Sequence, residues 1–290
     1  MFRKKVILKS PHGRSIRVGE RTILMGVLNV TPDSFYDGGK FLNLDSALKK
    51  AEDMIENGAL IIDVGGESTR PSSLPVEVDE ELERVIPVVE KIRQNFDVFI
   101  SIDTYKSKVA DEALSKGADM VNDISGLNFD PDMVKVVSKW EAPLVIMHIK
   151  GRPRDMQKNP QYENVVEEIK SYWKNSIDRA KRHGVKDEKI ILDPGIGFGK
   201  LLEHNFQILR GIDSFKDLGY PLLLGFSRKS MIGMVLGGLP PEDRLEGTLA
   251  LTAYSVLKRV EILRVHDIKE NKRVIDVVEA LLEWVNPLYG

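Results

Sequence analysis

The feature that most constrains the fold is a recurring pattern of short apolar runs, each followed by a segment with helical periodicity. Eight apolar runs occur, at residues 23–30, 60–65, 98–104, 119–125, 143–149, 189–194, 221–227 and 261–267. Helix-like segments lie between them, for example Asp79–Asn95, Pro131–Trp140 and Tyr162–His183. Strands that alternate with helices form parallel βα units, and eight such units close a TIM barrel. The sequence therefore predicts an α/β fold of the (β/α)8 TIM-barrel type, with an open doubly wound sheet as the alternative.

The first residues follow a different pattern. Apolar and polar residues alternate over residues 4–23, on either side of the turn-forming segment Pro11–Arg14. This alternation predicts two short strands joined in a β-hairpin. We find no linker long enough to divide the rest of the chain. We therefore expect an N-terminal β-hairpin extension at residues 1–22 and a single barrel domain at residues 23–290.

Composition excludes several classes of function. The 42 basic and 44 acidic residues are spread along the 290 positions without a basic block, so we do not expect nucleic acid as a partner. The absence of cysteine excludes disulfides, thiolate metal sites and a cysteine nucleophile. No apolar run has the length of a signal peptide or a membrane span. We expect a cytoplasmic protein that does not enter the membrane.

Polar side chains stand at the end of every apolar run. They include Asn29, Asp63, Asp103, Asn122, His148, Asp193, Ser227 and Arg264. A polar group at the end of a buried strand is costly unless it is paired or in use, and this rim is where parallel α/β folds bind ligands. Each residue alone is more simply a helix cap or a core polar group with its hydrogen bonds satisfied. All eight ends together are hard to explain as capping and predict an active site.

Three of these residues suit a flat heterocycle. Asp103, Asn122 and Asp193 end three different strands, and their carboxylates and amide can pair with neighbouring ring and amino N–H groups. The simpler alternative is that Asp103 caps the helix beginning near Lys106 and that Asn122 bonds locally. A metal cluster is a further option, although these ligand types specify no coordination geometry.

A second set of residues suits an anion. Arg264 and His266 lie two positions apart on one strand, so both side chains point to the same face. Together they are typical of a phosphate or diphosphate site, or else they pair with water or a carboxylate inside the barrel. Lys229 follows another strand, where it can pair with an acid, form a Schiff base, donate to a ligand carbonyl, or lie on the surface.

Two long loops and one glycine-rich stretch complete the predicted site. The loops Asn29–Gly39 and Gly65–Ser73 are long for βα connections and are candidate lids. In the stretch Asp193–Lys200, alternate glycines are expected to leave room for a flat ligand, with Phe198 beside its ring. The glycine spacing does not match a dinucleotide-binding fingerprint.

These motifs together resemble the pterin-binding TIM-barrel family, in particular its dihydropteroate synthases. The resemblance runs in family order from Ile23 to the last helix. It is carried by the stretches Met25–Phe35, Asp63–Pro71, Ser101–Thr104, Val121–Ile124, Met147–His148, Asp193–Lys200, Gly225–Ser230 and Arg264–Asp267. The resemblance implies a transferase that joins p-aminobenzoate to 6-hydroxymethyl-7,8-dihydropterin diphosphate in folate biosynthesis.

The resemblance also implies roles for individual residues. The pterin would bind at Asp103, Asn122, Asp193 and Lys229, the diphosphate at Asn29, Thr69, Arg264 and His266, and p-aminobenzoate at Phe35, Thr69, Arg70, Pro71 and Ser230. The catalytic residues would be Asp103, Lys229, Arg264 and His266. Mg²⁺ would be held near Asn29 by diphosphate oxygens. The family also implies a homodimer formed through the late helices.

The chain departs from the family pattern at two places. Val260–Glu261 stands where a Gly-Ala pair is usual, and Ile149–Pro153 stands where Met-Gln-Gly-Thr-Pro is usual. Three other functions remain as alternatives. They are a methyltetrahydrofolate-dependent methyltransferase, a Schiff-base aldolase that uses Lys229, and a non-catalytic protein that binds pterin or phosphate.

Overall fold

The central element is a ring of eight parallel strands. The computed structural model describes residues 3–31 and 39–283, except for the side chains of residues 39–43. Strands are hydrogen-bonded in the order β8-β7-β6-β5-β4-β3-β10-β9, and a parallel bridge from Leu192 to Leu222 joins the two ends. The strands are β3 (Ile23–Asn29), β4 (Ile61–Gly65), β5 (Phe99–Asp103), β6 (Met120–Asp123), β7 (Leu144–Met147), β8 (Ile190–Asp193), β9 (Leu223–Leu224) and β10 (Ile262–Val265). The barrel prediction is confirmed, and the open sheet is excluded.

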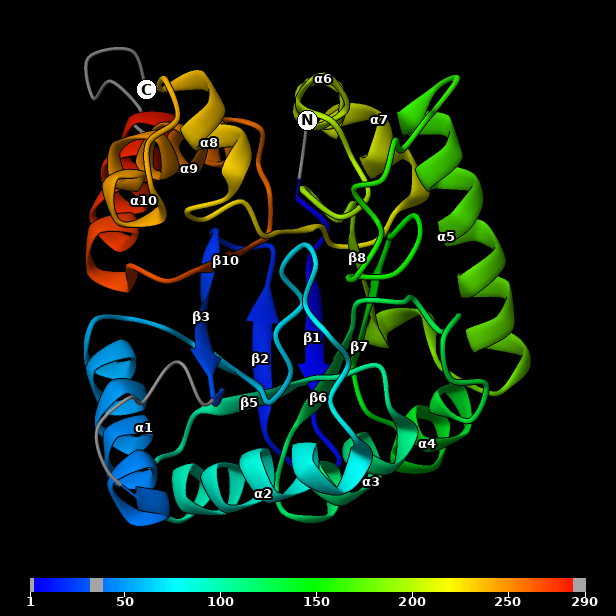
Figure 1. Ribbon diagram of the computed structural model, residues 1–290, viewed down its shortest axis with the longest axis vertical. Helices are drawn as coiled ribbons and strands as arrows, with labels where there is room; N and C mark the ends of the chain where they lie inside the picture. Colours follow the sequence, from blue (N-terminus) through cyan, green and yellow to red (C-terminus); the bar gives the residue numbers. More distant parts are fainter. Residues whose placement is uncertain (1–2, 32–38, 284–290) are drawn as a thin grey trace.

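Helices surround this ring on the outside (Figure 1). They are α1 (Gly39–Glu56), α2 (Val78–Asn95), α3 (Ser107–Ser115), α4 (Met133–Trp140), α5 (Val165–Arg182), α6 (Leu202–Arg210), α7 (Ile212–Phe215), α8 (Ser230–Val235), α9 (Leu245–Leu257) and α10 (Ile268–Glu283). The helices α2, α4 and α5 match the segments predicted from periodicity to within three residues at each end. Among the described residues, no helix combines the length and the apolar composition that crossing a membrane requires.

The interior of the ring is filled in layers. Side chains two residues apart point to the same side of a strand, and alternate strands supply the residues of one layer. One apolar layer contains Met25, Phe99, Val145 and Leu223, and the other contains Ile61, Met120, Ile191 and Ile262. Two residues beyond the second set, on the same four strands, lie Asp63, Asn122, Asp193 and Arg264. We call these four residues the polar layer, and it rests directly on an apolar floor.

A β-hairpin closes the opposite, amino-terminal end of the barrel. Strands β1 (Val6–Lys9) and β2 (Ser15–Val18) pair antiparallel, with Val6 opposite Val18. The buried side chains of Leu8 and Val18 pack in the same cluster as the two apolar layers. The hairpin lies across the centre of the barrel in Figure 1. The predicted hairpin is confirmed, and it acts as a plug for the barrel floor.

Two buried carboxylates attach the N-terminal segment to the barrel. Glu279 of α10 is 0% exposed and accepts hydrogen bonds from Arg3 Nη2 at 2.6 Å and from the Thr22 amide at 2.9 Å. Glu261 accepts from the Lys4 amide at 2.8 Å and from the Leu222 amide at 2.9 Å. The contacts of Glu261 explain why the chain departs from the family pattern at this position. Glu261 satisfies backbone donors of the barrel and of the N-terminal segment at once.

We expect Glu279→Gln to lower the free energy of unfolding by about 3 kcal/mol, because it leaves the Arg3 guanidinium buried without its counter-charge. The Arg3 side chain is only 4% exposed, so water cannot replace the carboxylate. Urea unfolding followed by circular dichroism measures the change. The exposed Glu283 at the end of the same helix supplies the control Glu283→Gln, which should change stability by less than about 0.5 kcal/mol. Equal stability of the two variants would contradict the anchoring role.

Candidate active site

An ion-pair network spans the mouth of the barrel. Arg264 of β10 donates from Nε to Asp63 Oδ2 at 2.6 Å and from Nη2 to Asp103 Oδ2 at 2.7 Å. The Asn122 side-chain amide donates to the same Asp63 oxygen at 3.0 Å. Asp63 is 0% exposed, and the network therefore lies in a region with little water. Three members of the polar layer thus meet near the barrel axis, with Asp103 of β5 next to them.

The network has one more carboxylate than it has cations. Burial raises the pKa of Asp103 to about 7; Arg264 opposes that shift, and the charge of Asp63 adds to it. Burial also works against the charge of Arg264, but the two carboxylates outweigh burial and raise its pKa. Arg264 therefore stays charged, and Asp103 is the member of the network that can exchange a proton near neutral pH.

Several buried acceptors in the network have no hydrogen-bond partner among the described residues. These atoms are Asp63 Oδ1, Asp103 Oδ1 and Asn122 Oδ1. A buried polar atom without a partner costs about 1–3 kcal/mol, so three of them in one place are expensive for the folded protein. A flat ligand that presents several N–H groups would satisfy them. The geometry is therefore that of a receptor for a hydrogen-bond donor edge.

The capping alternative for Asp103 is wrong. Helix α3 begins at Ser107, and no side chain caps it from its N-cap residue, Lys106. The Ser107 amide instead donates to Asp130 at 2.7 Å. Asp103 faces the barrel interior and is bonded to Arg264.

Asp193 and Lys229 form the opposite wall. Asp193 is 5% exposed, and its Oδ1 accepts from the Gly195 amide at 2.7 Å. Lys229 precedes α8; its Nζ donates to the Ile196 carbonyl and lies 4.4 Å from the centre of the Phe198 ring. Burial lowers the pKa of Lys229 to about 8, and the charge of Asp193 limits that shift. Lys229 is thus part of the site rather than a surface lysine.

The glycines of this wall serve mainly to pack backbone against backbone. A Cβ on Gly195 would lie 1.9 Å from the His148 carbonyl oxygen, and one on Gly199 would lie 2.2 Å from that of Lys150. Both also have positive φ values, 66° and 62°. The expectation that the glycines leave room for a ligand is therefore wrong at these two positions. A Cβ on Gly197 would instead meet the Lys229 side chain at 3.2 Å.

His266 lies beside the network in a neutral form. Its Nδ1 is 3.0 Å from the Ser227 hydroxyl, and burial, helped by the charge of Arg264, lowers its pKa to about 3. In the structure the charge of Arg264 is shared by Asp63 and Asp103, and its Nη1 group makes no hydrogen bond to the described residues. The predicted anion site at Arg264 and His266 therefore stays a prediction, with Nη1 as its available donor.

The remaining predicted residues lie on the rim. Asn29 ends β3 opposite Gly65 of β4, and its side chain is partly buried. The loop after β4 carries Thr69, Arg70 and Pro71, and it reaches the loop after β7 through a hydrogen bond from the Ser72 amide to the Pro153 carbonyl at 3.1 Å. Ser230 is the exposed first residue of α8. Phe35 and most of the first predicted lid lie outside the described residues.

Metal ligands are sparse in this region. Within residues 3–31 and 39–283, no three His, Cys, Asp or Glu side chains converge into a metal site. Asn29 offers a single amide oxygen. Such a ligand fits Mg²⁺, which commonly takes one or two protein oxygens and completes its shell with substrate phosphates and water. The metal-cluster alternative for Asp103, Asn122 and Asp193 has no support in this geometry.

Two pairings in the site were not predicted, although Asp63 and His148 are among the strand-end residues that the sequence marks. The sequence marks Asp63 only as the end of a strand, whereas in the structure it accepts hydrogen bonds from both Arg264 and Asn122. Its position two residues after Ile61 is the sequence signal that places its side chain on the inner face of the barrel. His148 and Lys200 form a second unpredicted pair, in which the buried ammonium lies 2.9 Å from His148 Nδ1 and donates to the Phe198 carbonyl at 2.9 Å. This pair holds the glycine-rich wall against the end of β7.

Comparison with known proteins identifies the family. Residues 25–266 match the family model of the pterin binding enzymes. A dihydropteroate synthase of Clostridium beijerinckii is 49% identical over 93% of this chain and 97% of its own length. The structure of Clostridium difficile dihydropteroate synthase in the presence of pteroic acid has a TM-score of 0.87 and 51% identity, covering 92% of this chain and 99% of that one. The Xanthomonas albilineans enzyme with 4-aminobenzoic acid has a TM-score of 0.90 and 35% identity, covering 98% and 100%. The chain therefore belongs to the pterin-binding enzyme family and, within it, to the dihydropteroate synthases.

Proposed function

We propose that the polar layer, together with Asp103, carries the reaction of the dihydropteroate synthases in this chain. In that reaction p-aminobenzoate and 6-hydroxymethyl-7,8-dihydropterin diphosphate give 7,8-dihydropteroate and diphosphate. The observation that carries the assignment is the group of buried acceptors on Asp63, Asp103 and Asn122 that have no partner among the described residues. The amino and ring N–H groups of a pterin are donors of the kind these oxygens require.

The departure of diphosphate is the more demanding step, because negative charge develops on the leaving group. Arg264 Nη1 and the neighbouring His266 would bind the diphosphate and stabilise the charge that develops as the C–O bond to the pterin breaks. Mg²⁺, held by diphosphate oxygens and Asn29, would neutralise further charge on the leaving group. The Asp103 carboxylate lies in the network beside Arg264, where it would stabilise the positive charge left on the pterin methylene group.

The arylamine would then attack that carbon. Its amine is a weak base that already has a free lone pair, so the attack requires no strong general base. The protonated secondary amine that results is acidic and would lose its proton to water or to the departing diphosphate. Thr69, Arg70, Pro71 and Ser230 lie on the rim, where they would hold the ring and carboxylate of p-aminobenzoate, as would Phe35. The complexes reported for the Clostridium difficile and Xanthomonas albilineans enzymes support these assignments, since their ligands are pteroic acid and 4-aminobenzoic acid.

One assay tests the assignment and separates it from its rivals. Purified protein is mixed with the pterin diphosphate, Mg²⁺ and p-aminobenzoate, and dihydropteroate and diphosphate are measured. We expect both products in equal amounts. Tight pterin binding without diphosphate release would instead indicate a binding protein. Methyl transfer from methyltetrahydrofolate, or borohydride trapping of a carbonyl substrate on Lys229, would indicate one of the other enzymes.

We expect kcat/KM for the pterin diphosphate to follow a bell-shaped pH profile. Below a pKa of about 7, Asp103 takes up a proton and loses its charge. Above a pKa of about 8, Lys229 loses its proton and donates less strongly to a pterin carbonyl. Lys229→Arg keeps the positive charge at high pH, so it should remove the alkaline limb while leaving the acidic limb in place. An alkaline limb that persists unchanged in Lys229→Arg would contradict this assignment.

We further propose a homodimer that uses the late helices. Half of the large apolar side chains that are exposed in the described residues lie on α8 and α10 or directly after α8. They are Met234, Val235, Leu236, Val277 and Leu281. Light scattering on the purified protein tests the proposal. We expect twice the chain mass for the native protein and a monomer for Met234→Lys combined with Val277→Lys.

A further inference from the structure

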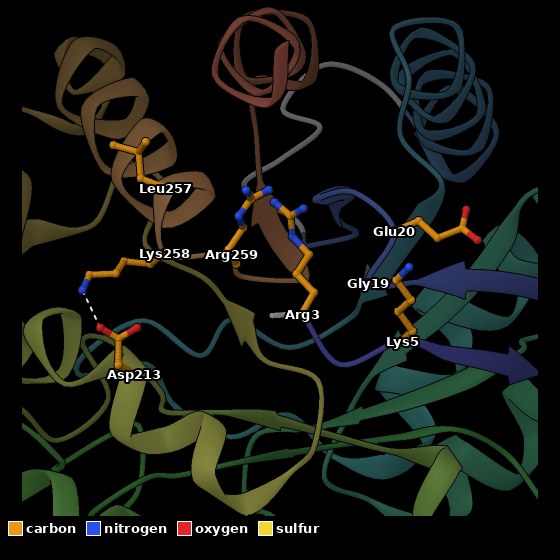
Figure 2. A pocket seen from close by; sticks show the side chains of 8 residues that line it. All are labelled: Arg3, Lys5, Gly19, Glu20, Asp213, Leu257, Lys258 and Arg259. Carbon is orange, nitrogen blue, oxygen red and sulfur yellow. Dashed lines mark hydrogen bonds and ion pairs between the residues drawn. The ribbon is translucent and has the colours of Figure 1, made fainter. Parts of the chain in front are cut away.

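A second concave region lies at the amino-terminal end of the barrel, away from the polar layer. It has a volume of about 570 Å³. Its walls come from the segment before β1, the turn after β2, helix α7 and the end of α9 (Figure 2). The lining residues are Arg3, Lys5, Gly19, Glu20, Asp213, Leu257, Lys258 and Arg259. We call this region the basal pocket. None of these residues takes part in the proposed reaction.

The acids around the basal pocket are already paired. Asp213 binds Lys258 Nζ at 2.5 Å, and Glu20 lies 3.7 Å from Arg17. Behind the pocket, Glu279 is shared by two guanidinium groups, Arg3 at 2.6 Å and Arg259 at 3.8 Å. A single carboxylate between two arginines leaves one positive charge without compensation.

Lys5 adds a second uncompensated charge. Among the described residues it has no ion-pair partner, and it is exposed on the wall formed by the N-terminal segment. Two positive charges therefore remain after every ion pair of the pocket has been counted. Figure 2 shows the Arg3 and Arg259 side chains reaching toward the same place from separate segments of the chain.

Arg3 supplies the observation that points to a ligand. Its side chain is only 4% exposed, and its Nε is buried with no hydrogen-bond partner among the described residues. A buried N–H donor on a cation is costly to leave unpaired. Guanidinium groups match the geometry of phosphate oxygens, and ion-assisted hydrogen bonds of this type are among the strong ones.

From these observations we propose that the basal pocket binds a phosphate group, as the free dianion or as a phosphate monoester. The bound group would receive hydrogen bonds from Arg259 and Lys5, and from Arg3 Nε once the N-terminal segment adjusts around it. It would link the N-terminal segment to the end of α9. Because the pocket forms only when those segments are folded together, binding stabilises the folded chain.

The test measures the thermal midpoint of the whole protein in increasing inorganic phosphate, against sodium chloride of equal ionic strength. We expect the midpoint to rise with phosphate beyond the chloride control in the native protein. In the double variant Lys5→Gln, Arg259→Gln, the apparent Kd for phosphate should be weakened at least 10-fold. Lys49 on α1 is exposed and forms no ion pair with the described residues, so Lys49→Gln is a charge-matched control that should keep the native response.

A second arm separates the basal pocket from the active site, since phosphate can also bind where diphosphate does. His266→Gln should keep the phosphate response of the basal pocket, and the double variant should keep native synthase activity. Adenosine 5′-monophosphate replaces phosphate in a parallel titration; tighter binding identifies a monoester as the ligand, and equal binding identifies the free ion. If the response is unchanged in the double variant, or is lost in His266→Gln instead, the proposal is overturned.

Discussion

Arg264→Met is expected to lower kcat/KM for the pterin diphosphate about 1,000-fold and the free energy of unfolding by about 3 kcal/mol. The two effects have different causes. On the proposed mechanism, activity falls because the leaving diphosphate loses its guanidinium partner in a region with little water. Stability falls because Asp63 and Asp103, which both bond to Arg264, are left as two buried carboxylates without a counter-charge. Initial rates and urea unfolding measure the two quantities separately.

A second substitution separates these causes. Adding Asp63→Asn to Arg264→Met removes one of the two unpaired charges, so most of the lost stability should return while kcat/KM stays low. The exposed Arg21 at the other end of the barrel, which pairs with Asp276 at 3.2 Å, supplies the control Arg21→Met. That control should leave activity unchanged and stability within about 0.5 kcal/mol. A rate for Arg264→Met within threefold of native would show that Arg264 has no part in the chemistry.

The barrel was predictable because its signal is local and repeated. Strands that are buried on both faces appear in a sequence as continuous apolar runs. Each apolar run of this chain contains one strand, whose ends differ from the predicted ends by a few residues. Strand β9 is the weakest case. The apolar run 221–227 gives only Leu223–Leu224 as strand, because Leu222 pairs by a single bridge with Leu192. The hairpin was predictable for the same reason, since its alternation is visible within a few residues.

The polar layer was only partly predictable. Asn122, Asp193 and Arg264 are predicted as site residues because each stands at the end of an apolar run. Asp63 carries the same signal, but its role depends on Arg264, which is 201 positions away in the sequence. Asp63 lies two residues after Ile61, just as the other members of the polar layer lie two residues after Met120, Ile191 and Ile262. This shared spacing predicts that Asp63 belongs to the polar layer. Spacing within a strand can thus identify a layer, whereas the pairing inside that layer requires the closed ring.

Contacts between distant segments account for what remained unpredicted. Gly195 and Gly199 look like space for a ligand in the sequence, but the backbone of the loop after β7 occupies that space. Glu261 looks like an unexplained departure from the family pattern, but it binds the amides of Lys4 and Leu222. In each case the deciding partner lies far away in the sequence, and local periodicity carries no information about it.

Asp103→Asn is expected to lower kcat about 100-fold without lowering stability. The substitution keeps the size of the side chain and removes its charge, so the cation that forms as diphosphate departs loses the carboxylate proposed to stabilise it. Pterin binding in the ground state should weaken less, because the amide oxygen can still accept a hydrogen bond. The result should therefore appear in kcat more than in KM. Steady-state kinetics with varied pterin diphosphate separates the two.

The matched control is Asp123→Asn at the end of the neighbouring strand. Asp123 is also fully buried, but it accepts hydrogen bonds from the amides of Ser125 and Leu127 at 2.8 and 2.7 Å and so holds a local turn. Its substitution should lower stability and leave kcat near the native value. Asp103→Asn should do the opposite, because Asp63 alone still neutralises Arg264. A fall in stability with unchanged kcat for Asp103→Asn would show that this carboxylate supports the fold rather than the reaction.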